Sequence, residues 1–458
     1  MNPKNILFSL NTMLVSETEV LLDAPVRLDV EHYTPKKTAQ DIRSTPDLAR
    51  FMALAVELLL LLAVFRLYHL ETPVFLRMSV IVCTAFLIHY WIPFRLKEPF
   101  FVTVSMGAAF YLLQPVVATL LVAFGLTLFL ILRSPMALRW RVFCLVAIFA
   151  GLIYGRATGS FHIPISFYPV FGALFMFRIV IYVYDLAHGK EPAHLLSFLS
   201  YFFLLPNYCF TLFPVIDYQT MRRGYYQRDI HDIAQQGICW MTRGTVQLML
   251  YRLVIYYNDR YLPDRISNLG ALISTMVLTF LLYLNVSGSF HLVVGMLHLF
   301  GYDLPETNRR YLLSSSFVDF WRRANIYWKD FMVKIVYFPV YFKIRKKGEF
   351  RAQLLATTVV FVVTWALHSY QFFWIQGSFI FTWPDTIFWT ILGFLIIANV
   401  LYERRHKARP DSSWRGRAFL AMRTLGTMAV IITLWSLWSS ASLNSWVYFM
   451  THWIRSGS

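Results

Sequence analysis

Long apolar segments separated by short polar stretches dominate the chain from residue 49 onward. Several windows of about twenty residues carry few or no charges, which is the length that a helix needs to cross a bilayer. No two-residue alternation of apolar and polar positions competes with this pattern, so strands are not expected. The pattern predicts an all-α, polytopic integral membrane protein with about ten to thirteen membrane segments, some of them short or re-entrant.

The expected membrane segments follow one another closely along the chain. They cover residues 51–70, 74–92, 100–132, 139–154, 164–184, 237–257, 269–286, 354–374, 386–401 and 419–438. The run 100–132 is too long for one span, and Pro115 is expected to divide it because proline lacks a backbone N–H. Pro206 and Pro214 lie in another apolar stretch and predict a broken or re-entrant helix there.

Two domains are expected from the change in composition near residue 48. Residues 1–48 are more polar and form an interfacial or cytosolic segment, and residues 49–458 form the transmembrane domain. Acidic residues follow the first short apolar run, at residues 6–10, so this segment does not have the pattern of a signal peptide. The aromatic tail at residues 446–453 is expected to lie at the membrane interface.

The composition supports the membrane class. Hydrophobic residues make up 57% of the chain and charged residues only 15%, whereas soluble proteins hold about a quarter charged residues. The net charge of +17 would also suit a nucleic-acid-binding protein, but cytoplasmic loops of membrane proteins collect Lys and Arg. We therefore expect membrane lipid as a partner and no nucleic acid, although an anionic donor or headgroup site would also use these charges.

Charge also predicts the orientation of the C-terminal half. Residues 302–351 hold eleven Lys and Arg against five Asp and Glu, and residues 403–423 hold seven against two. Both segments should therefore face the cytoplasm. The two spans between them, 354–374 and 386–401, return the chain to the same side, and the connection at 376–384 carries no charge before Asp385.

Potential metal ligands and thiols are few. The four cysteines lie far apart in apolar surroundings, without a CxxC pair or zinc spacing, and are expected to be buried free thiols. His291 and His298 would share a helix face, but no carboxylate or thiol accompanies them, so no metal site is expected.

One ionisable side chain, His368, lies within the span 354–374. An ionisable group at membrane depth is costly, and its default interpretation is functional. Histidine titrates nearest to neutral pH and suits general-base catalysis. The alternative is a histidine that only forms a hydrogen bond between helices.

A block of aromatic and basic residues precedes this span. Its characteristic positions are Ser316, Phe317, Phe320, Trp321, Arg322, Arg323, Asn325 and Ile326. The block, the aromatic stretch at 337–342 and His368 in a membrane helix together resemble the membrane-bound O-acyltransferase family. The resemblance is closest to its bacterial branch, which includes alginate O-acetyltransferases and teichoic-acid D-alanyl transferases, and it covers residues 160–380. Leu367 and Ser369 stand where close relatives have Trp and Gly, which implies a divergent subgroup.

The resemblance implies the roles of several residues. His368 would be the general base, and Asn325 would orient the imidazole or donate a hydrogen bond to the developing oxyanion; alternatively, Asn325 satisfies the backbone at a helix turn. The phosphates of an acyl donor would be held by basic residues, which are otherwise explained by the cytoplasmic charge bias: Arg322, Arg323, Lys343, Arg345, Lys346 and Lys347.

Other residues near these motifs have structural explanations. Trp321, Tyr327 and Trp328 are expected to anchor the chain at the membrane interface. Asp185 is expected to pair with Arg178 or Arg222, because charges buried in membranes are normally paired.

The resemblance also implies an activity. A family member of this kind would transfer an acyl group, such as acetyl, from a thioester to a hydroxyl of an envelope polysaccharide or other glycan. The thioester, on coenzyme A or an acyl carrier, is a co-substrate, and no cofactor is bound permanently. An extracytoplasmic protein would relay the acyl group, and the enzyme would be a multi-pass protein of the cell membrane, in bacteria the inner membrane. The alternatives are a transporter or channel with His368 as a proton or polar relay, and a non-catalytic scaffold.

Overall fold

The computed structural model describes residues 46–70, 72–189, 194–258, 266, 268–406 and 413–456. The predicted N-terminal segment therefore lies almost wholly outside the described residues. Helices dominate the described chain, and its only extended pairing is an isolated bridge between Tyr225 and Tyr302. Nine helical segments among the described residues are long and apolar enough to cross a membrane. The prediction of an all-α, polytopic membrane protein is confirmed.

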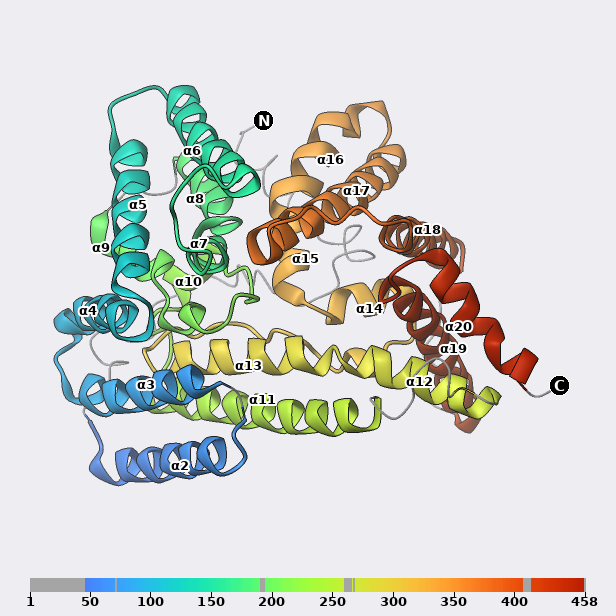
Figure 1. The fold of residues 1–458 in the computed structure, drawn as a ribbon, viewed down its shortest axis with the longest axis horizontal. Helices are drawn as coiled ribbons and strands as arrows, with labels where there is room; N and C mark the ends of the chain where they lie inside the picture. Colours follow the sequence, from blue (N-terminus) through green and yellow to red (C-terminus); the bar gives the residue numbers. More distant parts are fainter. Residues whose placement is uncertain are drawn as a thin grey trace, which may run out of the picture.

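The N-terminal helices match the predicted spans closely. They are α2 Leu48–Leu67, α3 Pro73–Trp91, α4 Phe94–Leu112, α5 Pro115–Arg133 and α6 Leu138–Thr158. Pro115 is the first residue of α5, where its missing N–H would have no helical partner in any case, so it divides the long apolar run as predicted. In Figure 1 these helices gather on one side of the molecule, from blue to green.

The next region consists of short helical pieces. They are α7 Phe167–Phe175, α8 Arg178–Ala187, α9 Leu195–Phe202, the 3₁₀ turn η1 Leu205–Tyr208 and α10 Tyr218–Gly224. The broken helix expected around Pro206 is thus present. The fully buried Arg178 donates hydrogen bonds to the carbonyls of Tyr201 (2.5 Å) and Phe202 (2.7 Å), which the end of α9 leaves without helical partners.

The predicted partners of Asp185 were wrong. Arg178 donates its hydrogen bonds to backbone carbonyls, and Arg222 forms an ion pair with Glu98 at 2.5 Å. Asp185 instead pairs at 2.8 Å with Lys334, which lies about 150 residues further along the chain and also contacts Asp217. Proximity in sequence did not indicate this partner, because the pairing depends on how distant helices pack.

Two helices, α11 Ile230–Asn258 and α13 Leu284–His298, pack against each other along most of their lengths and run side by side across the lower part of the molecule in Figure 1. The helix α12 Leu269–Leu281 lies between them in the sequence. A Cβ at Gly237 would lie 2.7 Å from the carbonyl oxygen of Gly295, and one at Gly244 would lie 2.6 Å from that of Gly288. The two glycine pairs let the helix backbones approach closely, as small residues do between membrane helices.

We expect Gly244→Ala to lower the free energy of unfolding by about 1–3 kcal/mol, because the added methyl group forces α11 and α13 apart. Gly151→Ala in α6 is the matched control: a Cβ at Gly151 meets no atom within 4 Å, so it should be neutral or slightly stabilising. Unfolding of both variants in mixed detergent micelles measures the difference. Equal stability of the two variants would contradict close packing at this crossing.

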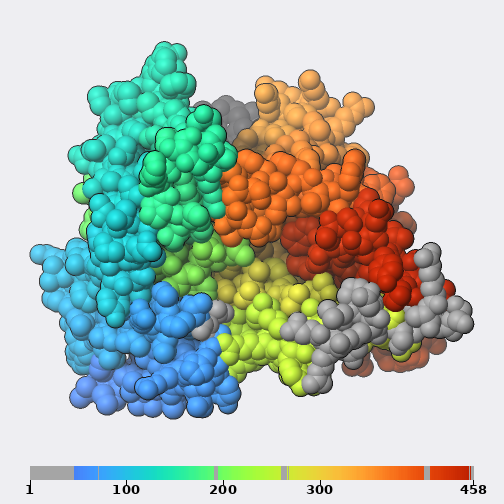
Figure 2. Space-filling view, viewed as in Figure 1, coloured from blue at the N-terminus to red at the C-terminus, as the bar shows by residue number. Residues whose placement is uncertain are grey.

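The C-terminal half supplies the remaining elements. They are η3 Tyr311–Leu313, α14 Phe317–Arg323, α15 Ile326–Met332, the π-helical turn η4 Val333–Tyr337, α16 Phe338–Ile344, the 3₁₀ turn η5 Arg345–Lys347, α17 Glu349–Gln376, α18 Trp383–Arg405, α19 Trp414–Trp438 and α20 Leu443–Ser456. Helices α17 and α18 are both long and apolar enough to cross a membrane, as predicted for this pair of spans, and their short connection is uncharged. Figure 2 shows these orange and red helices on the side opposite the N-terminal ones.

Candidate active site around His368

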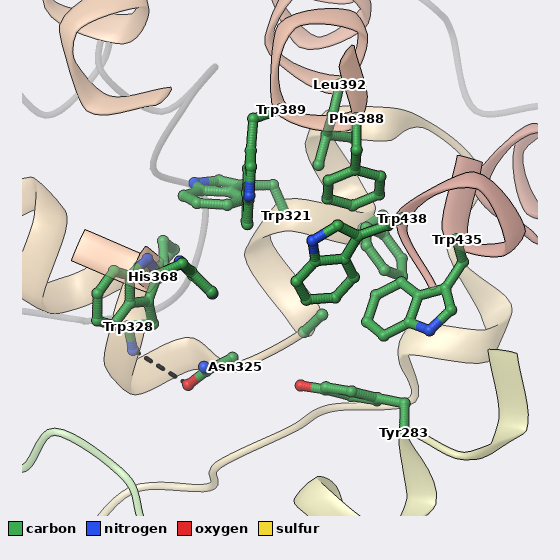
Figure 3. Close-up of a pocket in the computed structure, with 13 residues that line it drawn as sticks. Tyr283, Trp321, Asn325, Trp328, His368, Phe388, Trp389, Leu392, Trp435 and Trp438 are labelled. Carbon is green, nitrogen blue, oxygen red and sulfur yellow. Dashed lines mark hydrogen bonds between the residues drawn. The ribbon is translucent and has the colours of Figure 1, made fainter. Parts of the chain in front are cut away.

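Residues of helices α14, α15, α17, α18 and α19 line a partly open chamber with a volume of about 100 Å³. Most of its wall is aromatic. The lining residues are Tyr283, Phe320, Trp321, Ala324, Asn325, Trp328, Lys329, His368, Phe388, Trp389, Leu392, Trp435 and Trp438. His368 and Asn325, which sequence reasoning paired as catalytic residues, therefore face one small chamber (Figure 3).

The imidazole of His368 has a defined orientation. Its Nδ1 lies 2.9 Å from the carbonyl oxygen of Thr364, one turn earlier on α17. A carbonyl can only accept a hydrogen bond, so Nδ1 carries the proton and neutral His368 presents the lone pair of Nε2. Within the described part of the chain, Nε2 has no hydrogen-bond partner. This tautomer is the one that a general base working through Nε2 requires.

Three indoles surround the imidazole. The ring centroids of Trp389, Trp328 and Trp438 lie 4.7, 5.1 and 6.1 Å from that of His368. Figure 3 shows Trp328 beside the imidazole and the other indoles extending across the chamber. These contacts restrict the movement of the imidazole, which is partly buried.

Asn325 begins α15. Its backbone has a positive φ of 47°, a conformation that Asn adopts more readily than most residues, and its side-chain oxygen accepts from the N–H of Trp328 at 3.2 Å. Asn325 therefore satisfies the backbone at a helix turn, which is the structural alternative that the sequence left open. The same hydrogen bond holds the backbone of Trp328, whose ring contacts His368. The imidazole is oriented by Thr364 and not by Asn325. The Asn325 Nδ2 group makes no hydrogen bond among the described residues, so the predicted donation to an oxyanion stays a prediction.

The predicted donor-binding residues are not gathered at the chamber. Arg323 pairs with Asp319 on α14 at 2.5 Å, and neither it nor the partly buried Arg322 lines the cavity. Lys346 and Lys347 are exposed in η5, at the start of α17, which is about 30 Å from His368 along the helix axis. A donor held by these lysines would have to extend through that distance to reach the imidazole.

The aromatic residues of the motif block do not anchor the chain at the interface, and that prediction was wrong. Trp321 and Trp328 line the chamber. Tyr327 is buried, and its hydroxyl donates to the carbonyl of Pro305 at 2.8 Å. The apolar sequence around them could not distinguish a membrane interface from the interior of a helix bundle.

Two ionisable residues near the chamber were missed. Lys329 lines it with only 3% of its side chain exposed, and its Nζ lies 2.9 Å from Asp330. Asp385 lies behind the wall, where it accepts hydrogen bonds from Trp389 and Trp438. A carboxylate inside a span is a signal that could have revealed Asp385. Its position two residues after Trp383, at the start of α18, instead resembles a membrane boundary.

His291 and His298 contribute to helix packing. The Nδ1 atoms lie 2.7 and 2.8 Å from the carbonyls of Ser287 and Val294, and both rings pack against Trp240. Among the described residues there is no cluster of three or more His, Cys, Asp or Glu side chains that could hold a metal ion.

A comparison with models of known protein families finds no matching family, and a search of curated proteins finds no match. The function is therefore inferred from the chamber and from the motif block of residues 316–326.

Proposed function

We propose that this protein is a membrane-bound O-acyltransferase that moves a short acyl group from a thioester to a hydroxyl. The observation that supports this most is the imidazole of His368. Its Nδ1 proton is held by the carbonyl of Thr364, its Nε2 has no hydrogen-bond partner among the described residues, and His368 lines a small, largely aromatic chamber. The motif block supplies part of the same chamber through Phe320, Trp321 and Asn325.

The proposed reaction begins with proton removal. Nε2 of His368 takes the proton of the acceptor hydroxyl as the oxygen attacks the thioester carbonyl carbon, because an alcohol is a weak nucleophile at neutral pH. A new C–O bond forms and the carbonyl oxygen becomes negatively charged. When this intermediate collapses, the C–S bond breaks and the leaving thiolate takes the proton from the imidazolium. The products are an ester and a thiol, and His368 regains its original tautomer.

Two polar groups are available to the intermediate. Lys329 carries a buried ammonium group at the chamber, and the Nδ2 of Asn325 can donate a hydrogen bond. Preorganised donors in a water-poor site stabilise a developing oxyanion more strongly than the same donors in water. The motif block alone did not predict Lys329, whose ammonium group forms an ion pair with Asp330.

The acyl group is proposed to be short. A chamber of about 100 Å³ has room for an acyl group of a few carbons, because it is several times the space that one water molecule needs. We propose acetyl as the acyl group. The hydroxyl acceptor is proposed to belong to an envelope glycan, and an extracytoplasmic relay protein to take part, on the basis of the family resemblance alone.

We expect Trp435→Ala to widen the range of acyl groups. Trp435 forms one wall of the chamber between Tyr283 and Trp438, whose rings lie 5.4 and 4.9 Å from its own. Removing the indole makes room for extra methylenes, each worth about 0.8 kcal/mol when buried, so the ratio of octanoyl to acetyl transfer should rise by at least about tenfold.

The measurement compares membranes supplied with acetyl and octanoyl thioesters and quantifies both esters by mass spectrometry. Trp414→Ala is the matched control, because Trp414 lies on the same helix but is 69% exposed and outside the chamber. An unchanged ratio for Trp435→Ala, with acetyl transfer retained, would contradict the assignment of this chamber to the acyl group.

A further inference from the structure

Asp385 is a carboxylate in the first turn of α18, one of the candidate membrane spans, and only 7% of the residue is exposed. A carboxylate in such surroundings is unfavourable unless polar groups compensate its charge. Among the described residues no Lys, Arg or His forms an ion pair with it. Its position near the N-terminus of α18 offers partial compensation, because the helix dipole is positive there.

Two indole N–H groups donate hydrogen bonds to one oxygen of this carboxylate. Trp389, one turn further along α18, donates to Oδ1 of Asp385 at 3.2 Å. Trp438, at the end of α19, donates to the same oxygen at 2.8 Å. One atom thus joins α18 to α19 through two side chains, whose rings lie 5.9 Å apart at a steep angle.

The same two indoles contact the imidazole of His368. The centroid distances of 4.7 Å for Trp389 and 6.1 Å for Trp438 place both rings against it (Figure 3). Asp385 is therefore separated from His368 by a single layer of indoles. Phe388 packs parallel to Trp438 at 4.9 Å and limits its movement on another side.

We propose that Asp385 is a positioning residue, which fixes Trp389 and Trp438 through their N–H groups so that they hold the imidazole of His368 in its reactive orientation. A hydrogen bond fixes the direction of each N–H group, so an oxygen acceptor at this position orients both indoles more firmly than packing alone. The effect on catalysis in this proposal rests on the proposed acyl transfer. The hydrogen bonds of Asp385 with Trp389 and Trp438 do not depend on that function.

The test compares Asp385→Asn with Asp385→Leu in the full-length protein reconstituted in lipid nanodiscs. Asn keeps an oxygen at Oδ1 that can accept from both indoles, whereas Leu removes it. We expect Asp385→Leu to lower kcat for acyl transfer about 10- to 100-fold with little change in the KM of acetyl coenzyme A. We expect Asp385→Asn to stay within about threefold of the wild type, since misplacement of a catalytic group reduces turnover more than binding.

A second readout does not depend on activity. The ultraviolet resonance Raman band of the indole N–H should shift toward that of a weaker hydrogen bond in Asp385→Leu and stay near its wild-type position in Asp385→Asn. Asp232→Leu is the matched control, because the Asp232 side chain is 62% exposed on α11 and its loss should change neither readout. If the wild type transferred no acyl group, the proposed function would fail, while the Raman band would still report whether the cluster exists.

A coupling experiment separates positioning from general stability. In a Trp389→Phe, Trp438→Phe background the indole N–H groups are absent, so adding Asp385→Leu should lower kcat by less than about threefold further. The proposal is overturned if Asp385→Leu costs as much in that background as in the wild type. It is also overturned if Asp385→Leu leaves kcat unchanged, or if the Raman band does not respond to the loss of Asp385.

Discussion

We expect His368→Ala to lower acyl transfer by about 10²- to 10⁴-fold, which is the usual contribution of a general base. Without Nε2 of His368, no group at the chamber takes the proton from the acceptor hydroxyl, because Lys329 is paired with Asp330 as an ion pair. The measurement is the transfer of label from [¹⁴C]acetyl coenzyme A, or from the acetylated carrier protein, to envelope material in membrane vesicles.

The matched control is His406→Ala. His406 is exposed just after α18, outside the chamber, so its loss should leave the rate within about twofold of the wild type. Both variants must be present at equal amounts and with similar stability. Retention of wild-type transfer by folded His368→Ala would show that another group removes the proton.

The second large effect concerns stability at Lys334. This residue pairs with Asp185, whose side chain is 3% exposed, and it also contacts Asp217, so it joins the turn η4 to α8 and α10. We expect Lys334→Met to lower the free energy of unfolding by about 3–5 kcal/mol, because removing one partner leaves buried charges without compensation. Unfolding in mixed detergent micelles measures the loss.

Rescue tests the physical cause of that loss. Adding Asp185→Asn and Asp217→Asn to Lys334→Met removes the stranded charges, and Asn can still cap α10 as Asp217 does. We expect the triple variant to regain most of the lost stability. Lys343→Met, which removes an exposed lysine from α16, should be nearly neutral. A triple variant as unstable as Lys334→Met alone would mean that the charges are not the cause.

The fold could be predicted from local features of the sequence. Membrane spans depend on length and hydropathy, and helix ends such as the one at Pro115 depend on a single residue, so both can be inferred without knowing the neighbours. His368 was identified for the same reason, because an ionisable residue inside an apolar segment stands out. Its presence at a chamber together with Asn325 agrees with the pairing inferred from the motif block.

The rest of the site depends on contacts between distant segments. In the sequence, nothing distinguishes Trp435 and Trp438 from other aromatic residues of a membrane span. They reach the chamber because α19 packs against α18. Lys334 is one of many basic residues in its segment, and only the packing of η4 against α8 makes it the partner of Asp185. The resemblance implied a donor-binding role for Lys346 and Lys347, but the length of α17 places them far from His368.

Ser369, which stands where the proteins that the sequence resembles have glycine, is buried beside the imidazole. Ser369 is 1% exposed, beside His368 on α17, whereas Leu367 is partly buried. A side chain larger than glycine is therefore accommodated inside the bundle next to the imidazole. This is the position at which the motif departs from the glycine of the bacterial proteins that the sequence resembles.

Acyl transfer by His368 is tested most directly by mass spectrometry of base-labile acyl groups released from cell envelopes. The comparison includes wild-type cells, a deletion, and cells with His368→Ala at equal protein level. We predict that one ester, of a short acyl group, disappears in both the deletion and His368→Ala. If His368→Ala keeps every ester that the deletion loses, His368 is not the catalytic base. If the deletion loses no ester, acyl transfer to the envelope is contradicted, and a transporter or channel with His368 as a relay becomes the better explanation.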